Sequence, residues 1–452
     1  MIKVRRARPV VTTSPFDIGK LLDESRVATY QMQVLALTAL TIMFDGADIQ
    51  LLAFAIPSMM QEWGLTRPSF APVLAASLVG MTIGGALSGL VGDRVGRKVA
   101  LTASVTSFGL FTLAVVAVND LVTLGVLRFL AGVGLGGAIP NAAALASEYV
   151  PRRHRPLAVT LTIVCVPVGG TLAGLLAAPV LPTFGWRALF LIGGVAPILI
   201  ALLLVWLLPE SPRYLVRHPD RWPQLGGMLR RMGHDLPTTP AFVDSSDRLQ
   251  ARASIGALLA KGLTHDTVSL WGAFSSCLLA VYLAFNWVPA TLTSTGLDVA
   301  TASRGLAAFN FGGIAGAIVG ALMTTRLGSK VTLIAFAAGA AAAALITSAM
   351  PIGAGGPGGP IIGMLAMMGA LINGVQVGLY ALATHIYPTA LRATGVGTAL
   401  SVGRFGAILS TYLGAWALDV GGTTFFFASV AAAMTIAMAS VAVLRNHVPK
   451  AA

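Results

Sequence analysis

The stretch that decides the fold is Gly89-Leu90-Val91-Gly92-Asp93-Arg94-Val95-Gly96-Arg97-Lys98, a basic turn between two apolar runs. A shorter version, Thr325-Arg326-Leu327-Gly328-Ser329-Lys330, follows about half a chain length later and matches it at Arg, Gly and Lys. The glycines permit a sharp turn, and Asp93 can pair with an arginine or cap a helix end. A turn that recurs at the same place in each half indicates duplication of a unit.

The composition of the chain explains what that unit is. The 452 residues are 56% hydrophobic and only 10% charged, with a mean hydropathy of +0.81, which excludes a soluble globular protein. Apolar runs of about 20 residues predict twelve membrane-spanning helices. Their centres lie near residues 42, 82, 108, 132, 168, 198, 279, 313, 340, 372, 405 and 433. We therefore expect an all-α polytopic membrane protein of two pseudo-symmetric six-helix halves.

The longest polar interval divides the chain between the two halves. The predicted parts are an N-terminal tail (1–28), a first bundle (29–208), a linker (209–265), a second bundle (266–444) and a tail (445–452). No enzyme-sized soluble domain remains, and the sequence has no P-loop, nucleophile motif or cluster of metal ligands. Cys165 and Cys277 lie within predicted spans and are expected to pack as small core residues. An enzyme, a cofactor and a metal site are therefore not expected.

The net charge of +13 is a signal of topology. Most of the 30 Lys and Arg residues fall in the two tails and in the even-numbered loops. The positive-inside rule then places both termini in the cytoplasm, and this asymmetry argues against a nucleic-acid partner. Residues 1–28 contain no apolar core of a cleavable signal peptide. The many Arg, Ala and Gly residues suggest a bacterial gene rich in G+C, and we therefore expect the bacterial cytoplasmic (inner) membrane. We also expect the multi-pass protein to be a monomer.

Two carboxylates interrupt the first apolar run, in Phe44-Asp45-Gly46-Ala47-Asp48. A charge at membrane depth is costly and usually has a function. Asp45 and Asp48 are three residues apart, so they share one helix face and repel each other when both are charged. We expect one of them to take up and release a proton, and the sequence does not say which.

Two arginines, Arg128 and Arg404, are predicted at membrane depth. Arginine can hold a carboxylate through two parallel hydrogen bonds, which lysine cannot do. Arg404 lies near the middle of its span and is the expected clamp for an anionic substrate, although a structural role remains open. Arg128 is expected to adjust the proton affinity of the acidic pair.

The motifs resemble those of a known superfamily. Gly89–Lys98 is similar to the loop motif of the major facilitator superfamily, and Leu124-x-x-x-Arg128-x-x-x-Gly132-x-Gly134 resembles its fourth-helix motif. Further stretches resemble the aromatic acid:proton symporter family: Asp45–Asp48, Pro209–Leu215, Asn286–Pro289, Gln376 with Tyr380, and Tyr387–Gly397 leading to Gly403-Arg404. This resemblance implies uptake of a small aromatic carboxylate, such as a benzoate or hydroxybenzoate, together with protons, by alternating access.

An aromatic ligand needs flat apolar walls and a few polar groups. The candidates for substrate binding, besides Arg404, are Tyr380, Gln376, Trp287, Asn286 and Asn310, with Tyr282, Phe309, Phe311 and Asn373 as further members. Tyr380 and Gln376 are four residues apart on one helix face, and they also match the family.

A gate of ion pairs is expected at the cytoplasmic ends of the helices. Glu148, which is followed by Arg152 and Arg153, should join Asp93, Arg94 and Arg97 there. Exposed ion pairs are individually weak, so such a gate can break in each cycle. Thr325 holds the place of Asp93 in the second copy, so a switch there must be built differently.

Other functions remain open. The chain could be a proton symporter for another organic anion or a sugar, or a proton-driven exporter of drugs or metabolites. The acidic pair argues against a sugar. Val166-Pro167-Val168-Gly169-Gly170 is a poor version of the glycine-proline motif that antiporters of the superfamily carry. A receptor or an ATP-driven pump is disfavoured because the chain has no signalling domain and no nucleotide-binding motif.

Overall fold

The computed structural model describes residues 16–24, 28–234, 236, 241–244, 255–260, 262–351, 358–388 and 391–450. Parts of both predicted tails and of the predicted linker lie outside this range. So do Thr389 and Ala390, in the middle of the Tyr387–Gly397 stretch.

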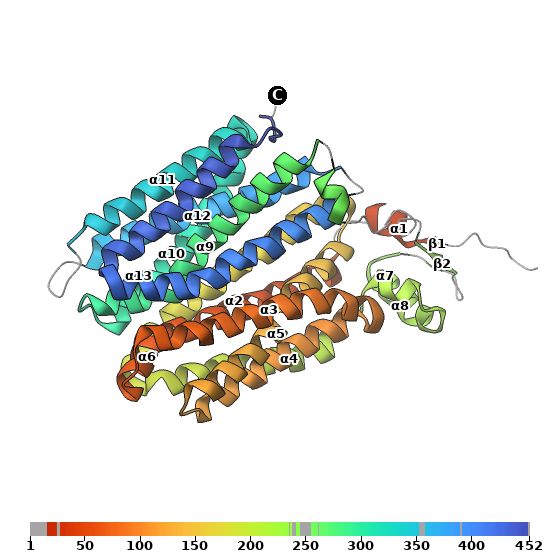
Figure 1. Cartoon of the computed structure of the whole chain (residues 1–452). Coiled ribbons are helices and arrows are strands. Elements are labelled where there is room, and N and C mark those ends of the chain that lie inside the picture. Colours follow the sequence, from red (N-terminus) through yellow and green to blue (C-terminus); the bar gives the residue numbers. More distant parts are fainter. Residues whose placement is uncertain are drawn as a thin grey trace, which may run out of the picture.

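The described chain is almost entirely helical and forms two bundles that lie side by side (Figure 1). The first bundle contains α2 (Thr29–Trp63), α3 (Arg67–Val95), α4 (Arg97–Ala114), α5 (Leu121–Glu148) and α6 (Arg155–Leu207). The second contains α9 (Thr264–Ser294), α10 (Val299–Leu327), α11 (Ser329–Ala349), α12 (Gly358–Ile386) and α13 (Arg392–Val443).

The short elements gather at one end of the first bundle, which we call the linker end (Figure 1). They are β1 (Phe16–Asp17), α1 (Ile18–Glu24), α7 (Pro212–Val216), α8 (Trp222–Arg231) and β2 (Phe242–Val243). Strands β1 and β2 pair in parallel and tie the first described residues to the linker. Short 3₁₀ turns lie at Val115–Ala117, Arg152–His154, Pro219–Arg221 and Ile255–Leu259. The opposite end of both bundles is called the distal end.

Ten helices of the described chain are long and apolar enough to cross a membrane. Helices α6 and α13 have 53 and 52 residues, more than twice the length of about 20 that a crossing requires. Each contains one glycine with non-helical backbone angles, Gly185 (φ 75°) in α6 and Gly422 (φ 59°) in α13. Residues that carry a side chain rarely adopt such a positive φ. Each of these two helices therefore has two arms that meet at its kinked glycine.

The repeated turns adopt the same backbone conformation. Gly96 joins α3 to α4 with φ 103° and ψ 151°, and Gly328 joins α10 to α11 with φ 83° and ψ 162°. Both conformations favour glycine because they have positive φ. The sequence repeat is therefore also a structural repeat.

Two aspartates begin helices at the distal end. Asp120 accepts a hydrogen bond from the Thr123 N–H at 2.8 Å and begins α5, while Asp298 accepts one from the Thr301 N–H at 3.0 Å and begins α10. Hydrogen bonds from Thr123, chiefly its backbone N–H, and from Thr301, chiefly its side chain, lower the pKa of the two carboxyl groups because they stabilise the charged form.

The bundles meet along three helix pairs, α2 with α9, α3 with α13 and α6 with α10. Close helix contacts within each bundle use glycines. A methyl group at Gly84 would overlap the Val133 backbone of α5, and one at Gly316 would overlap the Ala370 backbone of α12. The space between the bundles holds the candidate site.

Candidate functional site

A cavity of about 260 Å³ lies between the two bundles. Residues from α2, α3, α5 and α6 line one side, and residues from α9, α10, α12 and α13 line the other. Most of the lining is apolar, including Ile139, Val166, Leu278 and Phe285. The polar side chains around it all come from the second bundle: Tyr282, Asn373, Gln376, Tyr380 and Arg404. The cavity is thus an apolar space with one charged wall.

Arg404 supplies that charge from α13. Its guanidinium makes no hydrogen bond or ion pair with any residue that the structure describes, although Asp45 and Tyr282 lie within electrostatic range. Elsewhere in a low-dielectric interior, such a charge is paired. A cation that faces a cavity without a fixed partner is suited to binding an anion there.

Tyr380 and Gln376 line the cavity from one face of α12, as their spacing predicts. The ring of Phe274 on α9 packs edge-on against Tyr380, with 5.5 Å between ring centroids and an interplanar angle of 84°. This contact orients the Tyr380 ring.

The two aspartates of α2 have different surroundings. Asp48 Oδ2 lies 2.9 Å from Arg128 Nη2, and Asp48 Oδ1 accepts a hydrogen bond of 2.5 Å from the Thr112 hydroxyl. Arg128 Nη1 in turn donates to Thr112 at 3.4 Å. Asp48 and Arg128 are each only 1% exposed, so they form a buried ion pair, in which Arg128 Nε has no hydrogen-bond partner among the described residues.

Asp45, by contrast, is fully buried, and neither of its carboxylate oxygens has a hydrogen-bond partner among the described residues. Its helix packs tightly here because Gly46 lies against the Val166 backbone of α6. An isolated buried carboxylate is expensive to keep charged. Of the two aspartates, Asp45 is therefore the one whose carboxylate has no hydrogen bond or ion pair to compensate its charge among the described residues.

Several predicted substrate residues lie away from the cavity. Asn310 exchanges two hydrogen bonds with Gln50, of 2.8 and 3.0 Å, and so joins α10 to α2. Asn286 donates to the Ser410 hydroxyl at 3.3 Å. Trp287 is fully buried against Gly414. The structure thus uses these three side chains in helix packing rather than in the cavity wall.

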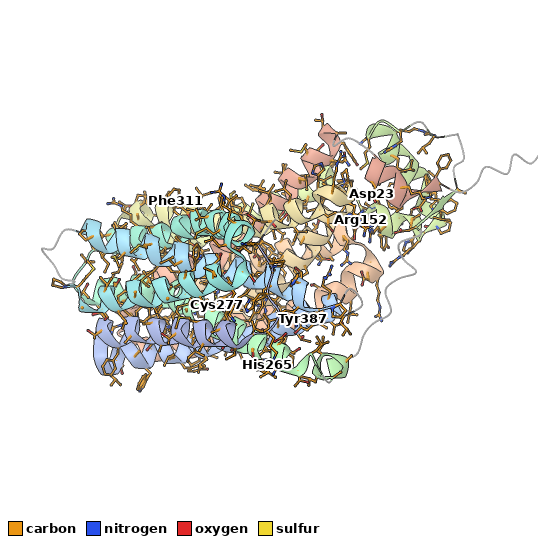
Figure 2. The ribbon with its side chains drawn as sticks, turned by 90° about the horizontal axis from the view of Figure 1, so that it is seen from above. Asp23, Arg152, His265, Cys277, Phe311 and Tyr387 are labelled. Carbon is orange, nitrogen blue, oxygen red and sulfur yellow. The ribbon has the colours of Figure 1, made fainter. Side chains whose placement is uncertain are left out.

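The two phenylalanines of the same prediction also point elsewhere. Phe311 is 65% exposed and projects from the outer surface of α10 (Figure 2). Phe309 is buried and packs edge-on against Phe285, with 6.0 Å between centroids. Phe311 was expected inside because the spacing alone does not show which face of α10 meets the other bundle.

The predicted gate residues form a cluster at the linker end. Arg97 Nη2 lies 2.5 Å from Asp93 Oδ1, and Arg97 Nε lies 4.0 Å from Glu148 Oε1. Arg97 also donates to Asn141 Oδ1 at 3.3 Å. Glu148 accepts a hydrogen bond from the Ser211 hydroxyl, which lies at the start of the linker.

Glu210 completes this cluster from the linker. Its Oε1 accepts hydrogen bonds from the backbone N–H groups of Lys98 (3.0 Å) and Ser211 (2.8 Å). Its backbone carbonyl accepts a hydrogen bond of 2.6 Å from the Tyr149 hydroxyl. Glu210 therefore holds the first turn of α4 against the end of α5.

Three predicted gate arginines are not in the cluster. Arg94 is exposed and has no hydrogen-bond or ion-pair partner in the described part of the chain. The Arg152 N–H donates to Asp23 Oδ1 at 2.7 Å (Figure 2), and Arg153 Nε lies 3.1 Å from His154 Nε2. The turn at 152–154 directs both side chains toward the surface, so their proximity to Glu148 in sequence does not bring them to it.

Comparison with known proteins decides the family. The family model described as Major Facilitator Superfamily matches residues 38–411. The chain belongs to the major facilitator superfamily. Members of this family are transporters, so this superfamily member is a secondary transporter in a membrane and is not an enzyme.

Two relatives of this transporter cover almost its whole length. It is 35% identical to the "Gallate transporter" of Pseudomonas putida over 415 residues, which cover 90% of each chain. It is 34% identical to the "4-hydroxybenzoate transporter PcaK" of Pseudomonas aeruginosa over 439 residues, which cover 95% of each. A solved structure of a "D-xylose-proton symporter" is 17% identical, with a TM-score of 0.68 and coverage of 94% and 99%, which shows a common fold.

Sequence reasoning missed several contributors to the sites of this transporter. Thr112, the hydroxyl partner of Asp48, carries no motif, and neither does Gln50. Glu210 and Ser211 lie in the quoted Pro209–Leu215 stretch, and a buried acidic residue next to the linker could have indicated a role. In the described part of the chain, no group of three or more His, Cys, Asp and Glu residues could hold a metal ion.

Proposed function

We propose that this transporter imports an aromatic carboxylate together with protons. The observation that carries the proposal is the Arg404 guanidinium, which lies in the wall of a mostly apolar cavity and has no hydrogen-bond or ion-pair partner among the described residues. A carboxylate would bind to this guanidinium, and the ring would lie against apolar side chains such as Val166 and Phe285. A volume of about 260 Å³ suits a single-ring acid better than a drug-sized ligand.

The substrate class also follows the relatives. The proteins at 35% and 34% identity are named for gallate and 4-hydroxybenzoate, which are both hydroxylated benzoates. Tyr380, Gln376 and Asn373 could donate to or accept from ring hydroxyl groups in the same cavity. These side chains would distinguish one substituted benzoate from another.

Asp45 is the proposed proton carrier. It is buried, has no hydrogen-bond partner among the described residues, and lies within electrostatic range of Arg404. Protonation of Asp45 removes a charge that attracts Arg404 and leaves the guanidinium free to bind the substrate anion. Proton and carboxylate would thus bind together, and the Asp48–Arg128 pair would hold the helices in place.

Alternating access would move the two bundles relative to each other, with the predicted domain boundaries at residues 208 and 266. The positive-inside rule would place the linker end in the cytoplasm. Asp93, Arg97, Glu148 and Glu210 would then stabilise the cytoplasmic face of the first bundle. The partners described for this cluster come from the first bundle and the linker, so it would act by shaping that bundle.

The test is uptake by the purified protein in proteoliposomes. The panel should contain labelled benzoate, 4-hydroxybenzoate, protocatechuate, gentisate, gallate, an aliphatic dicarboxylate and glucose, with and without an inward proton gradient. We expect gradient-dependent accumulation of at least one aromatic acid, abolished by a protonophore. Uptake of only the dicarboxylate or of glucose, or expulsion driven by the gradient, would refute the proposal.

A further inference from the structure

Two hollows outside the central cavity adjoin each other at the linker end of the first bundle. The first, the polar pocket, has a volume of about 490 Å³ and lies between α2, the end of α6 and α8. Its polar lining includes Tyr30, Gln33, Lys98, Gln224 and Arg231. The second, the apolar groove, has a volume of about 640 Å³ and follows α4 along the outer surface. Its lining includes Val99, Ala103, Thr106, Leu110 and Val205.

Lys98 lines both hollows and so joins them. Its ammonium group donates a hydrogen bond of 2.8 Å to the Val205 carbonyl, and it can make two more because an ammonium has three donors. Arg231 brings a second positive charge to the pocket, where its guanidinium carbon lies 6.0 Å from the centre of the Tyr30 ring.

The pocket carries a net positive charge. Glu210 is the acidic residue of its lining, and Glu210 Oε1 already accepts two backbone hydrogen bonds. Lys98 and Arg231 therefore outnumber it. A phosphate group would find cationic donors here, together with the polar side chains of Gln33 and Gln224.

The position and the length of the apolar groove both match those of a lipid acyl chain. Val99, Leu110 and Val205 are each about half exposed on the outer surface of two helices that are long and apolar enough to cross a membrane. From Lys98 to Leu110, α4 rises about 18 Å, which is close to the depth of about 15 Å of one hydrocarbon leaflet. Trp206 lines the polar pocket and is 83% exposed, and tryptophan is enriched at the level of lipid headgroups.

We propose that these two hollows form a binding site for an anionic phospholipid. The phosphate binds Lys98 and Arg231 in the polar pocket, and one acyl chain lies in the apolar groove along α4. The site adjoins the predicted gate, since the backbone N–H of Lys98 is the group that Glu210 holds. Lipid bound here would brace α4 against the linker.

Native mass spectrometry of the delipidated, full-length protein tests the proposal. Phosphatidylglycerol and phosphatidylcholine of equal chain length are titrated at low and high ionic strength. We expect tighter binding of phosphatidylglycerol, which weakens in high salt. Lys98→Gln should weaken phosphatidylglycerol binding about fivefold, since one basic side chain contributes about that factor near an anionic lipid. Lys98→Arg should bind as the wild type does.

Matched variants distinguish this site from a general effect of charge or of added bulk. Lys20→Gln removes the same charge from an exposed position in α1, outside both hollows, and should leave binding unchanged. Ala103→Phe fills the groove and should reduce binding of both lipids, whereas Ala321→Phe on the exposed face of α10 should not. Equal affinity for the two lipids, or equal effects of Lys98→Gln and Lys20→Gln, would overturn the proposal. So would full binding by Ala103→Phe.

Discussion

Asp48 Oδ2 lies 2.9 Å from Arg128 Nη2 inside the first bundle, and this contact gives the two aspartates of α2 different chemical surroundings. Asp48 has a cation and a hydroxyl as partners. The carboxylate of Asp45, three residues earlier, has no hydrogen bond to any described residue. Neutralising a carboxylate that is paired with a buried cation leaves that cation unpaired, whereas neutralising an unpaired buried carboxylate removes an uncompensated charge. This difference leads to the first two predictions.

Replacing Asp45 with Asn should abolish gradient-driven accumulation and preserve binding. The amide is nearly the same size as the carboxyl group and cannot take up a proton. Substrate exchange between equal pools on both sides should therefore continue in proteoliposomes, at a rate within about threefold of the wild type. Loss of exchange as well as accumulation, in a protein that still binds substrate, would show that Asp45 does more than carry the proton.

Replacing Asp48 with Asn should mainly reduce stability. The change leaves the Arg128 charge buried without its counter-ion, which typically costs about 3–5 kcal/mol. We expect a clear fall in the melting temperature in detergent, whereas Asp45→Asn serves as a matched control with little change. The double variant Asp48→Leu/Arg128→Met should recover much of the loss, because no unpaired charge remains. A melting temperature of Asp48→Asn equal to that of Asp45→Asn would contradict the role given to the pair.

Arg404 should determine the affinity for the carboxylate. Hydrogen bonds to a charged group contribute about 1.5–3 kcal/mol, so Arg404→Gln should raise the substrate Kd about 10- to 100-fold. Arg404→Lys should recover part of this affinity, because it keeps the charge and loses the two parallel hydrogen bonds. Isothermal titration with the best acid of the uptake panel measures both. Phe311→Ala, on the outer surface of α10, is the control and should leave Kd unchanged.

The Gln50–Asn310 pair should couple the two bundles. Each amide satisfies the other, and both are fully buried. Gln50→Leu or Asn310→Leu alone leaves a buried amide with fewer partners, at a cost of about 1–3 kcal/mol. The double variant should lose less than the sum of the single losses, since both amides are gone. Thermal unfolding of the four proteins measures this coupling, and additive losses would show that the two residues act independently.

The C-terminal tail should loosen in acid. Ser329 N donates to the Val448 carbonyl at 3.0 Å, Val448 N donates to Ser329 Oγ at 2.9 Å, and the His447 ring contacts the same hydroxyl at 3.4 Å. Burial lowers the pKa of His447 below its ordinary value of 6.5. The hydrogen bond with the Leu444 carbonyl and the nearby Asp266 oppose this effect, and Lys330 and His385 reinforce it.

Because the folded pKa is the lower one, unfolded His447 binds its proton more tightly. The stabilisation that neutral His447 gives to the folded tail is therefore complete above about pH 6.5, and it is lost as the pH falls below that value. Hydrogen exchange at Val448 and Ser329 should accelerate from pH 7.5 to pH 5.5, after correction for intrinsic rates. His447→Gln should show no such change. Equal pH dependence in both proteins would exclude His447 as the cause.

The tail also explains how the second-half turn is built without an aspartate. In the first half, the linker residue Glu210 packs on Gly96, and in the second half Val448 and Lys450 of the tail lie beside Gly328. Each turn is thus covered by the segment that follows the last helix of its own bundle. The sequence repeat predicted the two glycine turns, and it did not reveal these covers, because the covering segments have different sequences.

The sequence by itself determined the class of the protein, its two-fold repeat and the chemical types at its centre. Apolar runs long enough to cross a membrane can fold as little other than spanning helices, and an Arg or Asp among them stands out without knowledge of the fold. Arg404 was predicted in this way, and Gln376 and Tyr380 were predicted from their spacing and from the family resemblance; all three line the central cavity.

Only the tertiary structure decided which charges are paired and which face of each helix is turned inward. Asp45 and Asp48 look equivalent in the sequence, and the difference arises because Thr112 and Arg128, from two other helices, reach Asp48 alone. In a membrane protein both the lipid-facing and the buried face of a helix are apolar, so hydropathy does not distinguish them. The sequence therefore could not show that Phe311 faces outward or that Asn310 binds Gln50 of the other bundle.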